Sequence, residues 1–353
     1  MASSPDDPAL SERDGLEQIL CDLCGLEVGL SVYQVRDRLG ISKRQWQFVR
    51  CQRCGLLYVN PRPRLEALAG YYSTEDYYAY RRPEPMGCVQ TARTRLKEWL
   101  AICLRGYPRA ADSPKHEGSV EDSRYLRWLL SPLDGLLWAV PHYRPGGRLL
   151  DVGCGSGLYL RAMRRLGWQV SGVELSAKAA AYAREALGLD VREGSLEEAG
   201  FPDEHFDVVT LWHVLEHLPS PRRTLQEVVR VLKPDGILIC EVPNIDSLQS
   251  RVMGHRWFHL DPPRHLYAFS PATLRAMLQA AGLTVLEIAP VPDLVGWSES
   301  LLATWRPFGR RNTGYDALCR WPLRLALAPL EFVVARLGYG GHLWAKAARN
   351  DRM

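Results

Sequence analysis

Three glycines at alternate positions constrain this chain more than any other feature of its sequence. They lie in the stretch Leu149-Leu-Asp-Val-Gly-Cys-Gly-Ser-Gly-Leu-Tyr-Leu160, which begins as a short apolar strand and continues as a helical pattern. Glycine is needed where a tight turn has a positive φ or where a ligand lies against bare backbone. Such a loop between a strand and a helix places free N–H groups at the carboxyl edge of a parallel sheet, where open α/β sheets bind nucleotides.

An acid before the glycines distinguishes this loop from the dinucleotide-binding fingerprint, whose spacing is G-x-G-x-x-G. Here Gly153, Gly155 and Gly157 follow Asp151 with the spacing G-x-G-x-G. Because a carboxylate attracts a cation and repels a pyrophosphate, the pattern favours a positively charged ligand. A second acid, Glu174, ends the next apolar strand, where a carboxylate can hold ribose hydroxyls.

The pattern D-x-G-x-G-x-G resembles motif I of the class I S-adenosylmethionine-dependent methyltransferases. The strand-ending Glu174 and the segment Phe206–His217 strengthen this resemblance. It implies that S-adenosylmethionine binds at the glycine loop, with the adenine pocket after the third strand, where many relatives carry an aspartate and this chain has Ser195. The expected cofactor-binding residues are Asp151, Gly153, Cys154, Gly155, Gly157, Glu174, Leu175, Ser195, Leu196 and Trp212.

Strands and helices alternate regularly from Arg148 onward, which implies a parallel sheet with helices on both faces. The resemblance adds an antiparallel last strand and therefore predicts an α/β, Rossmann-like sheet of seven mostly parallel strands. The expected strands are Arg148–Val152, Gln169–Glu174, Asp190–Glu193, Phe206–Leu211, Gly236–Val242, Leu283–Pro290 and His342–Arg349. The expected helices are Ala92–Leu104, Tyr125–Val140, Leu158–Gly167, Ala177–Gly188, Pro221–Leu232 and Pro271–Ala281.

Two C-x-x-C pairs near the start predict a metal site. Cys21 and Cys24 form the first pair, Cys51 and Cys54 the second, and a glycine follows each pair. Four thiolates in this arrangement suit a closed tetrahedral zinc site, with a hairpin between the pairs. A segment this short builds little core, so the metal would supply folding energy. The alternative is four free cysteines.

The region before the glycine loop resembles one bacterial group of methyltransferases. Paired C-x-x-C motifs, the sequence Asn60-Pro-Arg-Pro63 and the tyrosines 71, 72, 77 and 78 precede the core, as in sugar C-methyltransferases and cell-envelope methyltransferases with a zinc-binding N-terminal segment. The tyrosines would either cover the cofactor pocket or pack between domains. We expect a disordered N-terminus (1–15), a zinc ribbon (16–64), a helical linker or lid (65–145), the cofactor-binding core (146–292), an apolar and basic helical insertion (293–340) and the last strand with its tail (341–353).

Histidines after the fourth strand are candidates for catalysis. The segment His213-Val-Leu-Glu216-His217 matches the H-x-x-E-H motif of one metalloprotease group, but that motif needs a helix and this one follows a strand. In ubiquinone-biosynthesis O-methyltransferases the similar segment reads E-x-x-E-H and binds a divalent cation. We expect His217 to be the proton acceptor, with His213 and His265 in reserve; a structural role is the alternative for each.

The acceptor is expected to be a small molecule, a sugar or a lipid-linked glycan, methylated on oxygen or carbon. An RNA methyltransferase is the alternative, but the ribbon has balanced charge and the formal net charge is only +4, so nucleic acid is not expected. The first residues are polar and acidic, unlike a signal peptide, so we expect a cytoplasmic protein. The apolar stretch Trp321–Leu337, interrupted by charges, could rest on the inner membrane surface.

Overall fold

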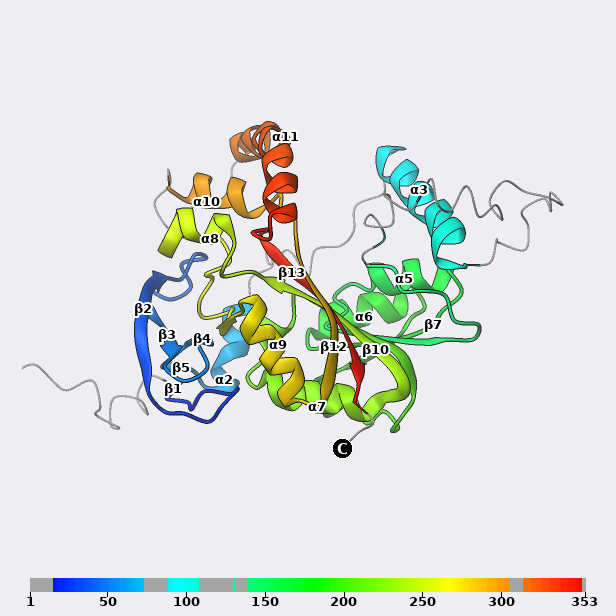
Figure 1. Ribbon diagram of the computed structural model, residues 1–353, viewed down its shortest axis with the longest axis horizontal. Coiled ribbons are helices and arrows are strands. Elements are labelled where there is room, and N and C mark those ends of the chain that lie inside the picture. Colours follow the sequence, from blue (N-terminus) through cyan, green and yellow to red (C-terminus); the bar gives the residue numbers. More distant parts are fainter. Residues whose placement is uncertain are drawn as a thin grey trace, which may run out of the picture. The chain divides into compact units, whose positions relative to one another are not determined.

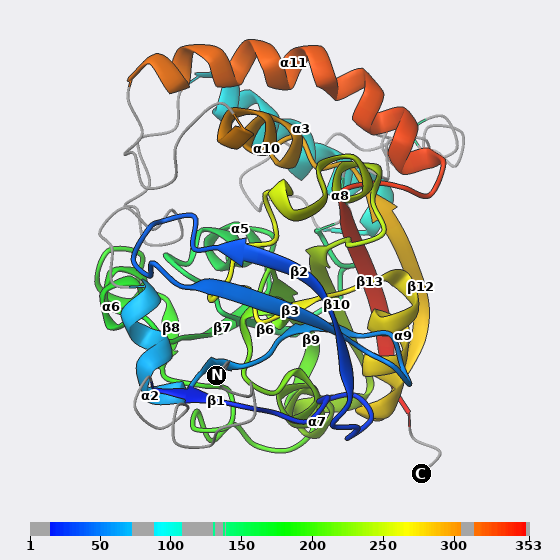
Figure 2. The ribbon, with the colours of Figure 1, turned by 90° about the vertical axis from the view of Figure 1, so that its left-hand side faces the viewer.

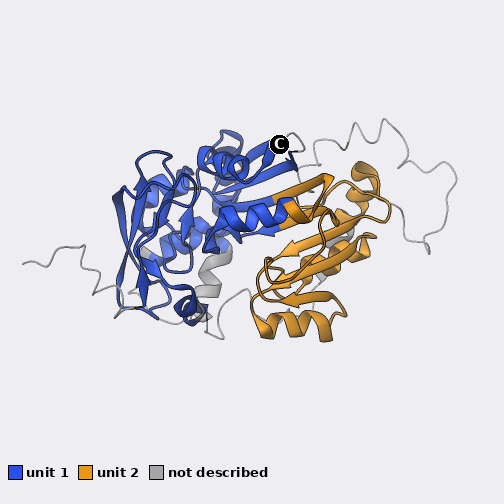
Figure 3. Ribbon diagram, turned by 90° about the horizontal axis from the view of Figure 1, so that it is seen from below, with its two compact units in different colours: residues 1–77, 211–229, 240–353 blue, residues 78–210, 230–239 orange. Residues whose placement is uncertain are grey.

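The computed structural model describes residues 15–72, 88–107, 130, 137, 139–304 and 314–350 (Figure 1). The chain divides into two compact units (Figure 3). One contains residues 1–77, 211–229 and 240–353, and the other contains residues 78–210 and 230–239. The predicted disordered N-terminus as far as residue 14, the tyrosines at 77 and 78 and most of the predicted helix Tyr125–Val140 lie outside the described residues.

The larger sheet has seven strands in the order β12-β13-β10-β9-β6-β7-β8. Strands β6, β7 and β8 pair in parallel, whereas β12 and β13 pair antiparallel and lie side by side in Figure 1. The bounds are β6 Arg148–Val152, β7 Gln169–Glu174, β8 Asp190–Glu193, β9 Phe206–Trp212, β10 Leu232–Pro243, β12 Leu283–Val291 and β13 His342–Arg349. The predicted seven-stranded, mostly parallel sheet with an antiparallel last strand is therefore confirmed.

The helices between these strands begin where the sequence places capping residues. Ser270 caps α9 with a reciprocal capping box to Thr273, and Ser176 accepts a hydrogen bond from Ala179 at the start of α6. The bounds are α3 Cys88–Arg105, α5 Leu158–Arg165, α6 Ala177–Glu185, α7 Pro221–Val231 and α9 Pro271–Ala280. The predicted end of α7 is one residue late, and β10 begins four residues before the predicted Gly236, because the chain extends directly from the helix into the strand.

The N-terminal segment forms a second, antiparallel sheet in the order β11-β4-β3-β2 (Figure 2). The predicted hairpin between the cysteine pairs is present, because β2 and β3 pair antiparallel. The outer strand β11 comes from the insertion between β10 and α9, residues 244–269. The sequence did not indicate this strand. The bounds are β1 Leu16–Glu17, β2 Gly29–Arg36, β3 Gln45–Cys51, β4 Leu57–Val59, β5 Arg62–Pro63, α2 Leu65–Leu68, η1 Ala69–Tyr72 and β11 Tyr267–Ala268.

The insertion also completes the core of this second sheet. Trp257 and Leu260 pack in one buried cluster with Trp46, Phe48 and Val59 of the N-terminal segment. Two short helices precede them, α8 Leu248–Met253 and η6 Gly254–Arg256. The apolar side chains of the N-terminal segment are thus buried partly against residues about two hundred positions later in the chain.

Two further helices, α10 Gly296–Thr304 and α11 Gly314–Arg336, occupy the second insertion. Glu331 of α11 is fully buried and accepts hydrogen bonds from the backbone of Asp293 and Gly341 and from the indole of Trp297. This charge, which interrupts the apolar stretch in the sequence, therefore points into the protein. Among the described helices, none combines the length and the apolar character that crossing a membrane requires.

Candidate functional site

The glycine loop has the backbone conformation that its sequence predicts. Gly153, Gly155 and Gly157 have φ values of 69°, 53° and 78°, which residues other than glycine rarely adopt. The loop also lies close to β7. A Cβ atom at Gly172 would lie 2.7 Å from the Cys154 sulfur, so only glycine allows this approach.

Two carboxylates accept hydrogen bonds at and beside the loop. Oε2 of Glu174 accepts a 2.8 Å hydrogen bond from the Gly155 N–H, and Oε1 accepts one of 2.8 Å from the Ser176 N–H. Oδ1 of Asp151 accepts a 2.7 Å hydrogen bond from the Thr210 hydroxyl on β9. Glu174 therefore holds the backbone of the loop and Asp151 is held by β9, and each carboxylate retains acceptor capacity for a ligand.

Both acids are buried in a way that favours a cation nearby. Asp151 is 2% exposed, and burial raises its pKa to about 7; the Thr210 hydroxyl partly offsets this and the Glu174 charge adds to it. Burial likewise raises the pKa of Glu174, while backbone N–H groups of Ser176 and Gly155 lower it. Since burial disfavours the ionised form, a positively charged ligand would stabilise both carboxylates.

The remaining predicted cofactor residues have varied surroundings. Leu196 is buried, whereas Leu175 is 70% exposed at the end of β7. The Ser195 hydroxyl donates to Glu198 within its own turn, at 2.8 Å. Trp212 is the last residue of β9 and belongs to the other compact unit, so its part in cofactor binding stays a prediction, as does that of Ser195.

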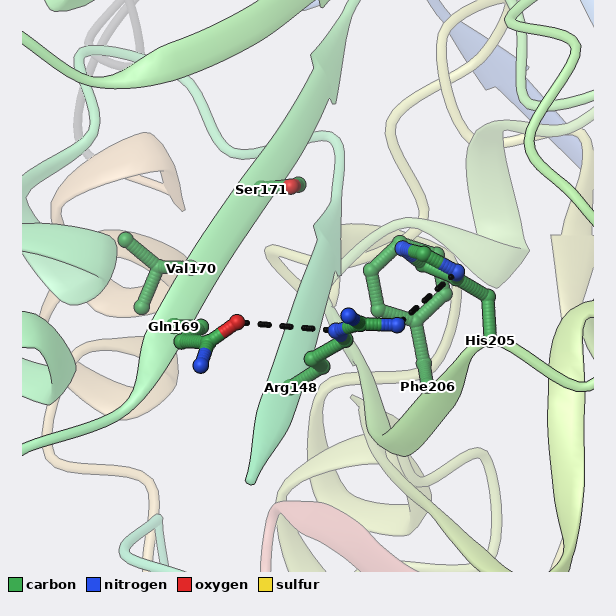
Figure 4. Close-up of a pocket in the computed structure, with 6 residues that line it drawn as sticks. All are labelled: Arg148, Gln169, Val170, Ser171, His205 and Phe206. Atoms are coloured by element: carbon green, nitrogen blue, oxygen red, sulfur yellow. Dashed lines mark hydrogen bonds between the residues drawn. The ribbon is translucent and has the colours of Figure 1, made fainter. Parts of the chain in front are cut away.

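A small pocket lies at the opposite edge of the same strands (Figure 4). Arg148, Gln169 and Phe206, which begin β6, β7 and β9, line it together with Val170, Ser171 and His205. The Arg148 guanidinium lies 3.5 Å from Gln169 Oε1 and 3.3 Å from His205 Nδ1. Open α/β sheets bind ligands at the carboxyl ends of their strands, so this pocket is not the predicted cofactor site.

The four predicted metal-binding cysteines converge. The sulfurs of Cys21 and Cys54 lie 3.5 Å apart, as do those of Cys24 and Cys51, and all four lie within 4.8 Å of one another. A tetrahedral zinc ion with Zn–S bonds of about 2.3 Å needs sulfurs about 3.8 Å apart. Each pair is closed by the same turn, in which the following glycine N–H donates to the first cysteine carbonyl at 2.7 and 3.0 Å. The donors therefore fit zinc.

The H-x-x-E-H motif does not bring its two histidines together. The His213 ring nitrogens lie 3.5 Å from Glu216 and 3.3 Å from Glu241. Burial lowers the pKa of His213, but these two carboxylates outweigh it and raise the pKa to about 10. A protonated imidazole has no lone pair, which argues against His213 as a base.

His217 makes hydrogen bonds through its Nδ1 atom. Its Nδ1 lies 3.0 Å from the Arg264 carbonyl and 3.0 Å from the Tyr72 hydroxyl. Burial lowers the pKa of His217, so its neutral form is favoured. Since a carbonyl only accepts, this contact assigns the proton to Nδ1 and leaves a lone pair on Nε2.

His265 lies against His217, with ring centroids 4.5 Å apart. Burial, then the neighbouring His217, lowers the pKa of His265 to about 3, and its Nδ1 donates to the His259 carbonyl at 2.7 Å. One ligand atom each from Glu216, His217 and His265 lies within 4.8 Å of the others. Cation binding by these three residues therefore stays an alternative to a role of His217 in proton transfer alone.

Four further residues join these histidines although sequence reasoning assigned them no role. Glu241 and His342 contact each other, and His259 and Asp293 lie beside His342. A signal existed only for His259, which lies in the histidine-rich insertion. Their positions along the chain do not indicate that they meet.

Comparisons with known proteins agree with the family that the glycine loop and the acids indicate. Residues 123–288 match a family described as a methyltransferase domain. The ubiquinone biosynthesis O-methyltransferase of Thiobacillus denitrificans is 37% identical over 156 residues, covering 40% of this chain and 67% of the relative. That of Cereibacter sphaeroides is 32% identical over 170 residues, covering 45% and 69%. This chain belongs to the class I S-adenosylmethionine-dependent methyltransferases.

The predicted family is therefore confirmed. A third relative, the ubiquinone biosynthesis O-methyltransferase of Maricaulis maris, is 34% identical over 152 residues, and the match covers 40% of this chain and 60% of the relative. In the present chain, the residues 123–288 that match the methyltransferase domain contain the glycine loop, both acids and the histidine segment after β9. The cysteine cluster, β12 beyond residue 288 and β13 lie outside the matched domain.

The substitution Asp151→Asn should separate the stability of this methyltransferase from its donor binding. Because the folded state raises the pKa of Asp151 to about 7, its contribution to stability is greatest below about pH 4 and is lost as the pH rises towards 7. The amide introduced by the substitution cannot ionise but can still accept from Thr210. Without ligand, the variant should gain thermal stability over wild type as the pH rises from 5 to 8.

The same substitution, Asp151→Asn, should weaken the binding of S-adenosylmethionine although it raises thermal stability. Losing a charged partner of the ligand should weaken S-adenosylmethionine binding about ten- to a hundredfold in calorimetry at pH 8. Asp190→Asn, at an exposed position on β8, serves as the control and should change neither quantity. Equal donor affinity in Asp151→Asn and wild type would contradict the assignment of Asp151.

Proposed function

We propose that this protein transfers a methyl group from S-adenosylmethionine to an oxygen of a small-molecule acceptor. The carrying observation is the loop in which the Gly155 N–H donates to Glu174, together with the buried Asp151. A sulfonium ligand would stabilise the ionised form of both carboxylates. The relatives' names, ubiquinone biosynthesis O-methyltransferase, support oxygen over carbon. A sugar or lipid-linked glycan hydroxyl is the acceptor that we favour.

The protein's own groups would act by binding, orienting and moving one proton. S-adenosylmethionine, when bound, supplies an electrophilic methyl group on sulfur. Asp151 and Glu174 would hold it against the loop, and the acceptor hydroxyl would be placed in line with the carbon–sulfur bond that breaks. As the new oxygen–carbon bond forms, the hydroxyl proton would pass to His217 Nε2, which the contact with the Arg264 carbonyl keeps unprotonated.

The acceptor can be identified in the cell. Mass spectrometry of lipid and glycan fractions from a strain lacking the gene should show a component that has lost one methyl group. The component should return to its normal mass when the wild-type gene is restored. A methyl group lost from RNA instead, with lipids and glycans unchanged, would favour the RNA methyltransferase alternative.

Replacing His217 should impair methyl transfer without weakening donor binding. General-base help is typically worth about a hundredfold to ten-thousandfold, so His217→Ala should lower turnover of the identified acceptor by that order. His255→Ala, which changes an exposed histidine, should retain full turnover. Full turnover in His217→Ala with an unchanged thermal midpoint would show that His217 is structural.

We also propose that Cys21, Cys24, Cys51 and Cys54 hold one structural zinc ion. The matched turns and the converging sulfurs support it. Cys51→Ser should lose the zinc that the wild-type chain retains during dialysis against a weak chelator, and its thermal midpoint should fall. Cys103→Ala, outside the cluster, should retain the zinc. A wild-type chain that is folded and free of zinc after mild purification would contradict the proposal.

A contact with the membrane surface is part of the same proposal. Leu325, Phe332 and Val333 on α11 are 69%, 53% and 56% exposed, while Glu331 faces the interior. A helix of this kind can lie in the interface plane. Flotation with phosphatidylglycerol vesicles at low salt should recover the wild type, and Leu325→Ser with Phe332→Ser should reduce recovery. Leu286→Ser on β12 is the matched control, and absence of wild-type binding would exclude the contact.

A further inference from the structure

Three side chains from separate parts of the chain converge near one end of the β12–β13 pair. Val291, the last residue of β12, pairs with His342, the first residue of β13. Asp293 follows β12 by two residues, and His259 comes from the insertion after β10. The register of the two strands thus brings Asp293 and His342 together, and the insertion adds His259.

The three facing atoms have the spacing of ligands around a metal ion. His259 Nε2 lies 2.8 Å from Asp293 Oδ2, His342 Nε2 lies 3.6 Å from the same oxygen, and the two Nε2 atoms are 3.4 Å apart. With bonds of about 2.1 Å to nitrogen and oxygen, tetrahedral ligands are about 3.4 Å apart and octahedral neighbours about 3.0 Å. The two separations from His342 Nε2, 3.4 and 3.6 Å, lie close to the tetrahedral value. The 2.8 Å contact between His259 and Asp293 is slightly shorter than the octahedral value and is the length of a hydrogen bond in the absence of a metal ion.

Hydrogen bonds alone explain the triangle less well. The contacts of His342 Nε2, at 3.4 and 3.6 Å, exceed the ordinary hydrogen-bond range of about 2.7–3.2 Å. Its other nitrogen, Nδ1, has a short partner, Glu241 Oε1 at 2.8 Å. An Nδ1–H donated to Glu241 leaves a lone pair on Nε2, directed at the triangle. Histidines that bind metals are typically held by a carboxylate in this way.

Asp293 is held as firmly as His342. Its Oδ1 accepts from the N–H groups of Val295 and Gly296 at 2.8 and 3.0 Å, and the Gly296 N–H also approaches Oδ2 at 3.0 Å. The buried Glu331 binds the N–H groups of Asp293 and Gly341, which fixes the backbone on both sides of the triangle.

Glycines are required around this carboxylate. A Cβ atom on Gly296 would lie 2.2 Å from Asp293 Oδ2, and one on Gly341 would lie 2.5 Å from Asp293 Cβ. Neither contact is physically possible. The chain therefore keeps two glycines where any side chain would displace the Asp293 carboxylate from the two imidazoles.

We propose that His259, Asp293 and His342 bind a divalent transition metal ion, with Glu241 as the residue that positions His342. Two imidazoles and one carboxylate are ligands that Zn²⁺ and Fe²⁺ accept, and three protein ligands leave at least one position open for water or a substrate oxygen. His259 and His342 are buried but not sealed, with side chains 9% and 12% exposed. The site is separate from the cysteine cluster and does not depend on the proposed methyl transfer.

Cobalt tests the site in the intact protein. A weak chelator first removes ions from three-ligand sites and leaves zinc on the four thiolates. Co²⁺ is then added in equilibrium dialysis. One equivalent should bind, with the visible absorption of nitrogen and oxygen ligands and without an intense sulfur-to-cobalt band. No uptake, or uptake with a sulfur band, would overturn the proposal, and neither outcome requires a variant to fold.

Variants locate the ion. Asp293→Asn and His259→Gln should weaken cobalt binding more than about a hundredfold, because losing even an outer carboxylate partner costs about ten- to a hundredfold. Glu241→Gln should show that smaller loss, and His255→Gln, exposed in the same insertion, should show none. Cobalt binding that is lost in His265→Gln but kept in Asp293→Asn would place the ion at the neighbouring triad and overturn the proposal. Circular dichroism of each variant identifies those that fail to fold.

Discussion

The buried salt bridge between Arg264 and Asp37 is the interaction on which the histidine-rich part of this methyltransferase depends. Its atoms are 2.8 Å apart and both side chains are fully buried, with Asp261 as a second partner at 2.6 Å. Removing one member of such a pair costs about 3–5 kcal/mol, because the remaining charge stays buried. Asp37 lies just after β2 and Arg264 lies just before β11, so the pair joins the N-terminal sheet to the insertion that completes it.

The backbone of Arg264 also makes contacts that matter for the candidate site. Its carbonyl accepts from both Tyr72 and His217, and this contact determines which nitrogen of His217 carries the proton. The same insertion supplies His259 and His265. A stable connection to the N-terminal sheet is therefore a condition for placing the candidate base and one ligand of the proposed metal site. The cysteine cluster, which would hold the other end of that sheet together, supports them indirectly.

Buried carboxylates occur both at the glycine loop and among the histidines. Around Asp151 and Glu174, burial raises the pKa of both acids, so the loop favours a bound cation. Around Glu216 and Glu241 the compensation is internal: burial raises their pKa values, but neighbouring histidines outweigh it and hold both at about 2. The first arrangement suits a ligand that comes and goes, and the second suits a fixed ion pair.

The amino-acid sequence by itself determined the local elements and the donor loop. Strands β6, β7, β8 and β13 have the predicted bounds, because the short apolar runs of β6 and β7 and the alternating burial of β13 depend on neighbouring residues. Gly153 and Gly194 directly follow β6 and β8. Each C-x-x-C turn is local, and the hairpin predicted between the two pairs brings them together. What only the tertiary structure decided is long-range: β11 is two residues long and pairs with β4, and His259, Asp293 and His342 meet across eighty positions of chain. No periodicity encodes such meetings, because they arise from strand register and from packing of apolar side chains that are far apart in the sequence.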